Sequence, residues 1–387
     1  MAWSALFHHR SLRATMRGAA SYLFGRRERR RVEMMRLSFR LRLMVLLFSR
    51  RLVRLPDLPR ARVWADREAF PRIRKLLRGA RHTIIIQMFI WKDDRLGREM
   101  AAALLAAADR GVKVFISKEA VGDFFETNGD FLATRDRDDE PVWRRFWRHP
   151  NILVSHAVQR DHAKVYVIDD RILLLTGMNI ADEYHDRWHD YLVELRGERY
   201  VQQYLARGDI DGRTGGIRMV MNTEGHKDIR PAVMALLRGA ERSIVVEHCY
   251  LSDPAVLQAL VNRSREGVFV TVIIPSVVDV HYYSNMQSVA FLLAKGSPRH
   301  LRVFLYPGMF HAKILLADRT KAFLGSANLI TSSLDEMGEV NVLIGGRMNR
   351  AVATLRMVLR ADLFRCRPLR SPPHLGWLMR LLAWMRL

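Results

Sequence analysis

The sequence predicts an α/β protein made of two similar α/β/α halves, each with a mixed, largely parallel sheet. Three observations lead to this fold class: a short segment recurs about 160 residues later, both copies are followed by the same order of strand, helix and strand, and both halves carry matching polar motifs. Strand–helix–strand units with short connections place their strands parallel. We therefore expect a duplication, with halves related by pseudo-two-fold symmetry and sheets that meet around a central cleft.

The repeated segment is Leu-Leu-Arg-Gly-Ala, at residues 76–80 and again at 236–240. Alone, so short a match is open to coincidence in a helix-rich chain. Each copy, however, leads into a β-rich run, a helical pattern, and then a glycine followed by a second strand. The corresponding ranges are 83–90, 97–110 and 111–116 in the first half, and 243–250, 255–265 and 267–274 in the second. A glycine-rich stretch at 208–216 predicts the boundary between halves 61–207 and 217–370.

A formal net charge of +23 predicts a polyanionic partner, either nucleic acid or an anionic membrane surface. About half of this charge is in residues 1–60, where fifteen arginines against three acidic residues predict a basic amphipathic arm. Residues 371–387, with Trp377 and Trp384 one heptad apart, predict an amphipathic C-terminal segment. Such segments suit the bilayer interface. A solvated tail, a transit peptide or a mis-assigned start is the alternative for the arm, and a core helix for the C-terminal segment.

Other features exclude whole classes of protein. With two cysteines, Cys249 and Cys366, the chain has no disulfide framework, so a reducing compartment is the simpler interpretation. No run approaches the roughly 20 apolar residues that span a bilayer. Residues 43–48 are too short, and follow too many arginines, to make a signal peptide. We therefore do not expect an integral membrane protein.

The polar motifs recur at a constant offset of 149 residues. The first half has His162, Lys164 and Asp169, with Asn179 and Asp190 further along the chain. The second half has the matching set, which is His311, Lys313, Asp318, Asn328 and Glu339. A single His-x-Lys is most often a polar strand face, but two copies that agree at five positions argue against that interpretation. Period-two alternation places the histidine and lysine of each motif on one strand face, and the aspartate begins a turn.

These residue types suit phosphodiester chemistry. A neutral imidazole can attack phosphorus to form a covalent intermediate, and a protonated one can donate to the leaving oxygen. The two lysines and the two asparagines can bind the non-bridging oxygens, which supplies without a metal what magnesium supplies elsewhere. Asp190 and Glu339 are candidates to fix the imidazole tautomers. We therefore expect neither a metal nor a cofactor.

The paired His-x-Lys-x4-Asp motif, each copy followed by a small-residue turn and an asparagine, resembles the phospholipase D superfamily. Residues 179–184 and 188–190, and residues 325–329, 332–333 and 339–341, are similar to bacterial cardiolipin synthases with two such motifs. The resemblance covers roughly residues 65 to 365 and implies a duplicated phospholipase D-like fold. Thr176 and Met337 depart from the family pattern, at positions that commonly hold glycine and asparagine.

The resemblance also implies a role for each motif residue. His162 is the expected nucleophile and His311 the expected acid and base. The orienting carboxylates would act crosswise, with Glu339 on His162 and Asp190 on His311. Asp169 and Asp318 belong to the catalytic motif, although in similar enzymes they bond to the backbone and not to substrate.

The expected protein is a peripheral enzyme of the bacterial inner membrane, a cardiolipin synthase that transfers a phosphatidyl group to phosphatidylglycerol through a phosphohistidine. Hydrolysis of phospholipids is the alternative, because the balance depends on water exclusion and acceptor position. A nuclease is disfavoured, since the sequence has no reader module or aromatic stacking surface. A catalytically inactive anion-binding scaffold is disfavoured because every catalytic residue type is present. The expected partner is an anionic phospholipid membrane, and the sequence carries no signal for an oligomeric state.

Overall fold

The computed structural model describes residues 60–122, 126, 141–157, 160–207, 216–346, 349–371, 373 and 376. All of them belong to one compact unit, Pro56–Leu387. The predicted basic arm lies outside the described residues except for Arg60. Most of the glycine-rich boundary and most of the predicted C-terminal segment also lie outside them. Within the described part of the chain, no helix has the length and apolar character needed to cross a membrane.

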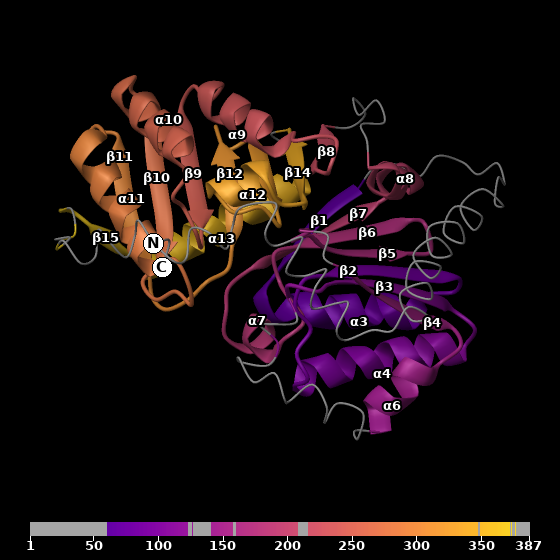
Figure 1. Ribbon diagram of the computed structural model, residues 1–387. Helices are drawn as coiled ribbons and strands as arrows, with labels where there is room; N and C mark the ends of the chain where they lie inside the picture. The colour runs from indigo at the N-terminus through magenta and orange to yellow at the C-terminus, as the bar shows by residue number, and fades with distance from the viewer. Residues whose placement is uncertain are drawn as a thin grey trace. The chain divides into compact units, whose positions relative to one another are not determined.

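The first half contains a seven-stranded sheet in the order β1-β7-β6-β5-β2-β3-β4 (Figure 1). Its strands are β1 (Arg60–Ala65), β2 (Thr83–Met88), β3 (Lys113–Glu119), β4 (Ile152–Ala157), β5 (Lys164–Ile168), β6 (Ile172–Thr176) and β7 (Tyr191–Arg196). Its helices are η2 (Asp66–Glu68), α3 (Ala69–Gly79), α4 (Arg95–Asp109), α6 (Pro141–Arg148), α7 (Asp182–Asp186) and α8 (Glu198–Ala206).

The second half contains an eight-stranded sheet in the order β15-β11-β10-β9-β12-β13-β14-β8. Its strands are β8 (Ile217–Asn222), β9 (Ser243–His248), β10 (Phe269–Pro275), β11 (Leu301–Tyr306), β12 (Lys313–Ala317), β13 (Lys321–Gly325), β14 (Glu339–Gly345) and β15 (Arg367–Leu369). Its helices are α9 (Ile229–Arg238), α10 (Pro254–Arg265), α11 (Tyr282–Lys295), α12 (Thr331–Asp335) and α13 (Arg350–Arg365).

The predicted fold class of two α/β halves with mixed sheets is confirmed, but fewer strand pairs are parallel than expected. The runs β2-β3-β4 and β9-β10-β11 are parallel, and the other neighbouring strands described in the two sheets are antiparallel. The parallel runs contain the predicted crossover units. After each motif histidine the chain instead turns back in tight hairpins, β5–β6 and β12–β13, which are antiparallel by construction.

Both hairpins turn at the motif aspartates. Asp169 and Asp170 have φ angles of 51° and 55°, and Asp318 and Arg319 have φ angles of 51° and 59°. Two successive positive φ angles form the type I′ turn, whose twist matches that of the flanking strands. Aspartate enters this conformation more readily than most side chains do. The four residues between lysine and aspartate therefore complete the five-residue strand that begins at the lysine and ends at the turn.

Each sheet has helices on both faces. Ile84, Ile86 and Met88 of β2 belong to the hydrophobic core under α3, α4 and α6, whereas Gln87 points to the opposite face and accepts a hydrogen bond from Tyr204 of α8. In the second half, α9, α10 and α11 cover the matching core. The halves interlock, because α8 contacts β8 and α13 contacts β1. Leu175 and Leu324, from opposite halves, line one small cavity where the inner faces meet.

Candidate active site

Each motif histidine precedes its hairpin and is hydrogen-bonded through its backbone to the opposite half. The N–H of His162 donates to the carbonyl of Gly338 at 2.7 Å, and the N–H of His311 donates to the carbonyl of His189 at 2.8 Å. Gly338 and His189 directly precede the two candidate orienting carboxylates, and they too are 149 residues apart. The same backbone contact, repeated under the pseudo-two-fold relation, sets each imidazole beside a carboxylate of the other half.

The first imidazole rests on Glu339. Nδ1 of His162 lies 3.0 Å from Oε1 of Glu339, which is fully buried. Two hydroxyls hold this carboxylate in place: Ser326 donates to Oε2 at 2.5 Å, and Ser333 donates to Oε1. The ring of Phe89 packs edge-on against the imidazole with 4.8 Å between centroids. Because Nδ1 faces the carboxylate, Nε2 is the nitrogen that can attack phosphorus.

The second imidazole rests on Asp190. Nδ1 of His311 lies 3.0 Å from Oδ2 of Asp190, whose other oxygen accepts a 2.7 Å hydrogen bond from the backbone N–H of Tyr191. Tyr184 packs edge-on against the imidazole, and Trp188 stacks on it. With these rings around it the side chain of His311 is 4% exposed, whereas that of His162 is 13% exposed.

The two carboxylates are supported differently. At the constant offset, Ser326 corresponds to Gly177, and Ser333 corresponds to Tyr184. A Cβ atom at Gly177 would lie 2.7 Å from Oδ2 of Asp190, so the glycine leaves room for that carboxylate and gives it no hydroxyl. The site is thus two-fold symmetric in its backbone and asymmetric in the hydrogen bonds that its carboxylates accept.

Both motif lysines are buried beside their histidines. Lys164 is 0% exposed, and its Nζ donates to the carbonyl of His162 at 2.6 Å. Nζ of Lys313 donates to the carbonyl of His311 at 2.8 Å and lies 3.1 Å from Nε2 of the same residue. When both amines are charged they attract an anion strongly, because electrostatic attraction is stronger in a water-poor site than in water.

The motif asparagines reach the same buried ends of the hairpins. Oδ1 of Asn179 accepts from the backbone N–H of Ile90 at 3.1 Å, and its Nδ2 donates to the hydroxyl of Tyr184 at 2.8 Å. Oδ1 of Asn328 accepts from Sγ of Cys249 at 3.2 Å. These contacts hold each amide oxygen to the protein, so an amide nitrogen is the part that could meet a phosphate oxygen. Their role in phosphate binding remains a prediction.

The motif aspartates lie elsewhere. Asp169 follows the far end of β5, where its carboxylate accepts hydrogen bonds of 2.7 to 3.1 Å from the backbone N–H groups of residues 81–83. Asp318 accepts in the same way from residues 241–243. These N–H groups follow the Leu-Leu-Arg-Gly-Ala repeat directly. The structure therefore does not bring Asp169 and Asp318 to the histidines, and their place in the motif is explained by a structural turn.

Burial and the crowded positive charges set the proton affinities of the site. Burial and Lys164 lower the pKa of His162 against the opposing pull of Glu339. Burial and the two lysines hold the pKa of His311 well below its usual value. Burial raises the pKa of Asp190 to about 7, although Lys313 opposes this, and burial lowers the pKa of Lys164 to about 7. Without a bound anion, adding another proton to the site is therefore unfavourable.

Other contacts of the site had a weak signal in the sequence or none. Ser326 and Ser333 stand within segments that resemble the family, but spacing alone did not show that their hydroxyls meet on Glu339. The rings of Phe89 and Trp188 come from loops and that of Tyr184 from the short helix α7, and the positions of all three depend on tertiary packing. At Thr176, one of the departures from the family pattern, the hydroxyl accepts from the N–H of residue 178 and donates to the carbonyl of residue 191.

A family model described as "Cardiolipin synthase, PLD-like domain" matches residues 73–207 and 233–361. The chain belongs to this phospholipase D-like family. Each matched range contains one motif histidine, so the resemblance predicted from the motifs is confirmed. Cardiolipin synthase B of Shigella flexneri and that of Escherichia coli K12 are both 28% identical to this phospholipase D-like chain over 314 residues. The match covers 72% of this chain and 74% of each relative. Cardiolipin synthase 2 of Bacillus cereus is 28% identical over 313 residues, and the match spans 59% of its length.

Solved structures of the same architecture support the fold of this phospholipase D-like protein. Phosphatidylserine synthase of Haemophilus influenzae Rd KW20 matches with a TM-score of 0.64 at 13% identity, over 85% of this chain and 94% of that one. Polyphosphate kinase of Porphyromonas gingivalis matches with a TM-score of 0.55 at 17% identity, over 83% of this chain and 52% of that one. The predicted arrangement of two α/β halves is thus found in solved structures.

Proposed function

We propose that this phospholipase D-like protein is a phosphatidyltransferase that makes cardiolipin from phosphatidylglycerol. The observation that carries the proposal is the crosswise pair of imidazoles, each on a buried carboxylate of the opposite half and each beside a buried lysine. The cardiolipin synthase description of the family favours a phospholipid as the phosphodiester. Residues 61–207 and 217–370 would be the two phospholipase D-like units, with residues 1–60 and 371–387 as basic or amphipathic ends.

In the first step, Nε2 of His162 attacks the phosphorus of one phosphatidylglycerol. A P–N bond forms, the P–O bond to the glycerol headgroup breaks, and the leaving oxygen takes a proton from His311. Glu339 stabilises the positive charge that develops on the His162 imidazole, and the lysines hold the non-bridging oxygens. The phosphatidyl group is left on His162 as a covalent intermediate.

In the second step, His311 takes the proton from the headgroup hydroxyl of a second phosphatidylglycerol. The new alkoxide attacks phosphorus, the P–N bond breaks, and His162 is restored. Two molecules of phosphatidylglycerol become one cardiolipin and one glycerol, with atoms and charge in balance. Near neutral pH the Asp190–His311 pair can hold the shuttled proton, since burial raises the pKa of Asp190 to about 7.

Water must be kept from the intermediate for transfer to exceed hydrolysis. His311 is 3% exposed and is enclosed by Tyr184 and Trp188, which leaves little room for bulk water on the acid–base side. A second lipid brought by the membrane is already concentrated at the site, which increases its advantage over water. These features favour transfer.

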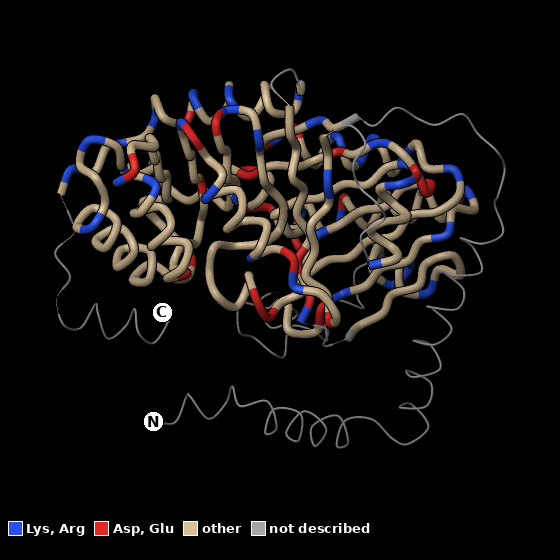
Figure 2. The backbone as a smooth tube through the Cα atoms, turned by 90° about the horizontal axis from the view of Figure 1, so that it is seen from above, with Lys and Arg blue, Asp and Glu red and all other residues tan. Residues whose placement is uncertain are grey.

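The membrane would meet the edge of the sheets at which the histidines lie. Figure 2 marks lysines and arginines in both halves, so charge alone selects no face. Exposed apolar side chains are more selective: Val277, Val280 and Tyr282 are 60%, 47% and 40% exposed in and just after the loop that follows β10. Tyr250 ties this loop to the site, because its hydroxyl donates to Asp279 and its ring contacts His311. An apolar rim around a lipid site suits insertion among acyl chains.

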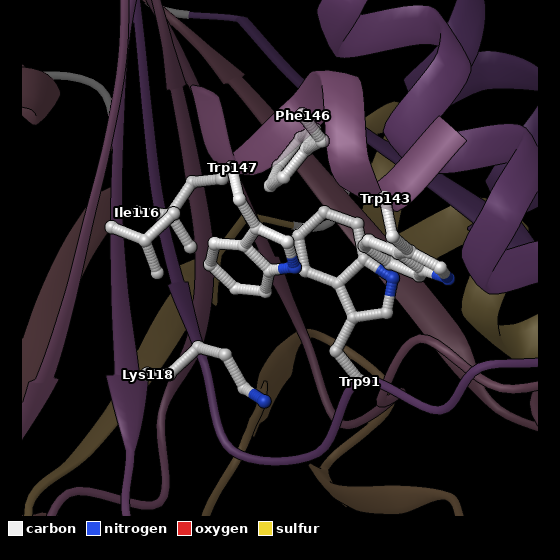
Figure 3. A pocket seen from close by; sticks show the side chains of 7 residues that line it. Trp91, Ile116, Lys118, Trp143, Phe146 and Trp147 are labelled. Carbon is white, nitrogen blue, oxygen red and sulfur yellow. The ribbon is translucent and has the colours of Figure 1, made fainter. Parts of the chain in front are cut away.

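A small aromatic hollow lies between α6 and the strands β3 and β4 (Figure 3). Trp91, Trp143, Phe146 and Trp147 surround it, with Lys118 at its edge. Trp91 is two residues beyond Phe89, which packs on the imidazole of His162.

The deciding experiment incubates the full chain with phosphatidylglycerol vesicles and resolves lipids and protein by mass spectrometry. The wild type should give cardiolipin and glycerol, and His162→Ala should give neither. His311→Ala lacks both the acid for the first step and the base for the second. The phosphatidyl adduct on His162 should therefore form slowly but then accumulate, because no base activates the acceptor. Phosphatidic acid in place of cardiolipin would overturn the transferase assignment, and turnover of DNA but not of lipid would overturn the substrate class.

The membrane face has its own test. Val277→Asp with Val280→Asp should weaken binding to anionic vesicles in a sedimentation assay. Phe269→Asp is the matched control, because Phe269 is 57% exposed at the opposite end of β10. Equal loss of binding for both changes would contradict the proposed orientation.

A further inference from the structure

A second cluster of titratable side chains lies at the junction of the two halves. His189, which precedes β7, meets Glu247 of β9 and Asp362 of α13, and all three are buried, at 4%, 0% and 3% exposure. We call these three residues the junction cluster. His189 belongs to the first half, whereas Glu247 and Asp362 belong to the second. The proposed transfer reaction uses none of their side chains.

We propose that the junction cluster binds a divalent transition-metal cation, of which zinc is the probe, that ties the two halves together. Imidazole nitrogen with carboxylate oxygen is a ligand set that zinc accepts readily. The proposed cation is structural, and it is separate from the phosphate chemistry of His162 and His311.

The spacing of the ligand atoms supports a cation at the centre. Nε2 of His189 lies 3.3 Å from Oδ2 of Asp362 and 3.7 Å from Oε2 of Glu247. One ligand atom from each of the three residues lies within 4.8 Å of the others. Ligands about 2.1 Å from a tetrahedral ion are about 3.4 Å apart. The two separations measured from Nε2 of His189 are thus close to the edge length of such a polyhedron.

The surroundings of His189 are those of a metal ligand. Nδ1 of His189 lies 2.5 Å from Oδ1 of Asp66, so a carboxylate can fix the tautomer that leaves Nε2 for an ion. Ligating histidines commonly donate their other N–H to such a carboxylate. The hydroxyl of Tyr191 donates to Oε2 of Glu247 at 2.9 Å and also lies 2.9 Å from Nε2 of His189, so it supplies a fourth candidate ligand atom at the same place.

Two oxygens of the cluster lack a hydrogen-bond donor. Among the described residues, no donor reaches Oε1 of Glu247 or Oδ2 of Asp362, although both atoms are buried. Oδ2 of Asp362 is the atom that faces His189. Buried carboxylate oxygens without donors are costly, and a bound cation is one arrangement that satisfies them.

At the pseudo-symmetric position of the first half, the protein supplies the positive charge from one of its own side chains. Glu247 pairs with Ile314 in the sheet as Gln87 pairs with Val165, so Gln87 is the counterpart of Glu247. There the guanidinium of Arg207 bonds to Oε1 of Gln87 at 3.1 Å and to Asp161 at 3.2 Å.

One half therefore has a neutral amide and a built-in cation, whereas the other has two buried carboxylates and a histidine. The guanidinium nearest to the junction cluster among the described ion pairs is that of Arg365, whose Nη1 is 3.8 Å from Asp362 and whose side chain is 57% exposed. A cation bound from solution would supply the charge that Arg207 supplies in the first half.

The alternative state has a proton in place of the metal. Burial acts to lower the pKa of His189, but the neighbouring carboxylates of Asp362, Asp66 and Glu247 raise it well above its usual value. In that state a charged imidazolium faces the carboxylates, and Nε2 is a donor. Metal binding and this protonation are mutually exclusive at Nε2, so a measurement can separate them.

The test uses the full chain, stripped with a chelator and then dialysed against zinc. We expect about one zinc ion per chain by elemental analysis, and a rise of about 5 °C in Tm at a hundredfold excess over Kd. Cobalt in place of zinc should give visible absorption bands of four-coordinate Co²⁺. Glu247→Gln and Asp362→Asn should lose both the bound ion and the rise in Tm.

Two controls make the result specific to the junction cluster. The double variant His162→Ala with His311→Ala should still bind the ion, which excludes the phosphate site. Glu194→Gln, which removes another fully buried carboxylate from β7, should also still bind it. A wild-type chain with no bound ion, no rise in Tm and no cobalt bands would overturn the proposal in favour of the imidazolium. All three readouts are independent of lipid turnover, so they do not depend on the proposed function.

Discussion

Replacing Glu339 by glutamine tests the role of the crosswise carboxylate most directly. Oε1 of Glu339 is 3.0 Å from Nδ1 of His162, so the positive charge that develops on the imidazole is about 4 Å from the carboxylate charge. At an effective dielectric constant of 20, that attraction is about 4 kcal/mol. Losing it from the transition state should reduce kcat by about 10³-fold, since each 1.36 kcal/mol is a factor of ten. Ser326 can still orient the glutamine, so we expect the folded structure to persist.

The assay is a single-turnover measurement of cardiolipin and of the phosphatidyl adduct, with Tm recorded for each variant. Glu194→Gln is the matched control, because Glu194 is equally buried but pairs with Arg72 and Arg196 outside the site. It should lower Tm and leave kcat within a few-fold of the wild type. A fall of less than tenfold for Glu339→Gln would refute the assignment of Glu339 as the partner of a charged imidazole.

Three further predictions follow from burial, hydrogen bonding and space. Burial lowers the pKa of Lys164 to about 7, so between pH 7 and 10 the folded state binds fewer protons than the unfolded state and stability rises with pH. Lys164→Met should flatten the rise of Tm with pH, and an unchanged slope would contradict this reasoning. Asp318→Asn should lower the free energy of unfolding by about 2 kcal/mol in denaturant titrations, because three backbone N–H groups lose a charged acceptor. It should leave kcat unchanged, and a lost kcat with normal stability would argue for a role of Asp318 at the phosphate. Gly177→Ala should reduce kcat, because the new Cβ would lie 2.7 Å from Asp190. Gly79→Ala is the control and should not reduce kcat, because a Cβ at Gly79 would meet no atom within 4 Å. Equal activities of the two variants would show that the position of Asp190 is not critical.

The sequence predicted those features that repeat. The recurring segment, the strand–helix–strand order and the offset of 149 residues predicted a duplicated α/β fold, which the structure and the comparisons confirm. The largely parallel sheet was wrong in proportion, because the spacing of His162 and Asp169 encodes a strand and a type I′ turn and so adds antiparallel neighbours. A turn between two strands that are adjacent in the sequence is a local pattern, so it can be predicted from the residues that form it.

Contacts that depend on the packing of distant segments were beyond the sequence. Ser333 is six residues from Glu339, but only the turn between them brings the hydroxyl back to the carboxylate. His189 and Asp362 are 173 residues apart, and nothing in their spacing indicates that α13 places them together. The aromatic hollow similarly combines Trp91 with side chains of α6, which follows it by fifty residues. Without a repeat or a regular period, such proximity has no signal in one sequence.

The exchange of carboxylates between the halves has a consequence for how this protein can change. A half expressed alone would carry a histidine without its acid, so neither half is a smaller enzyme. In an assembly of two identical chains every substitution near one histidine would occur near the other as well. Within one chain the two environments vary independently, which is how Ser326 can support Glu339 while Gly177 makes room for Asp190. The unequal proton affinities of the two imidazole–carboxylate pairs are thus a property that joining the halves in one chain makes possible.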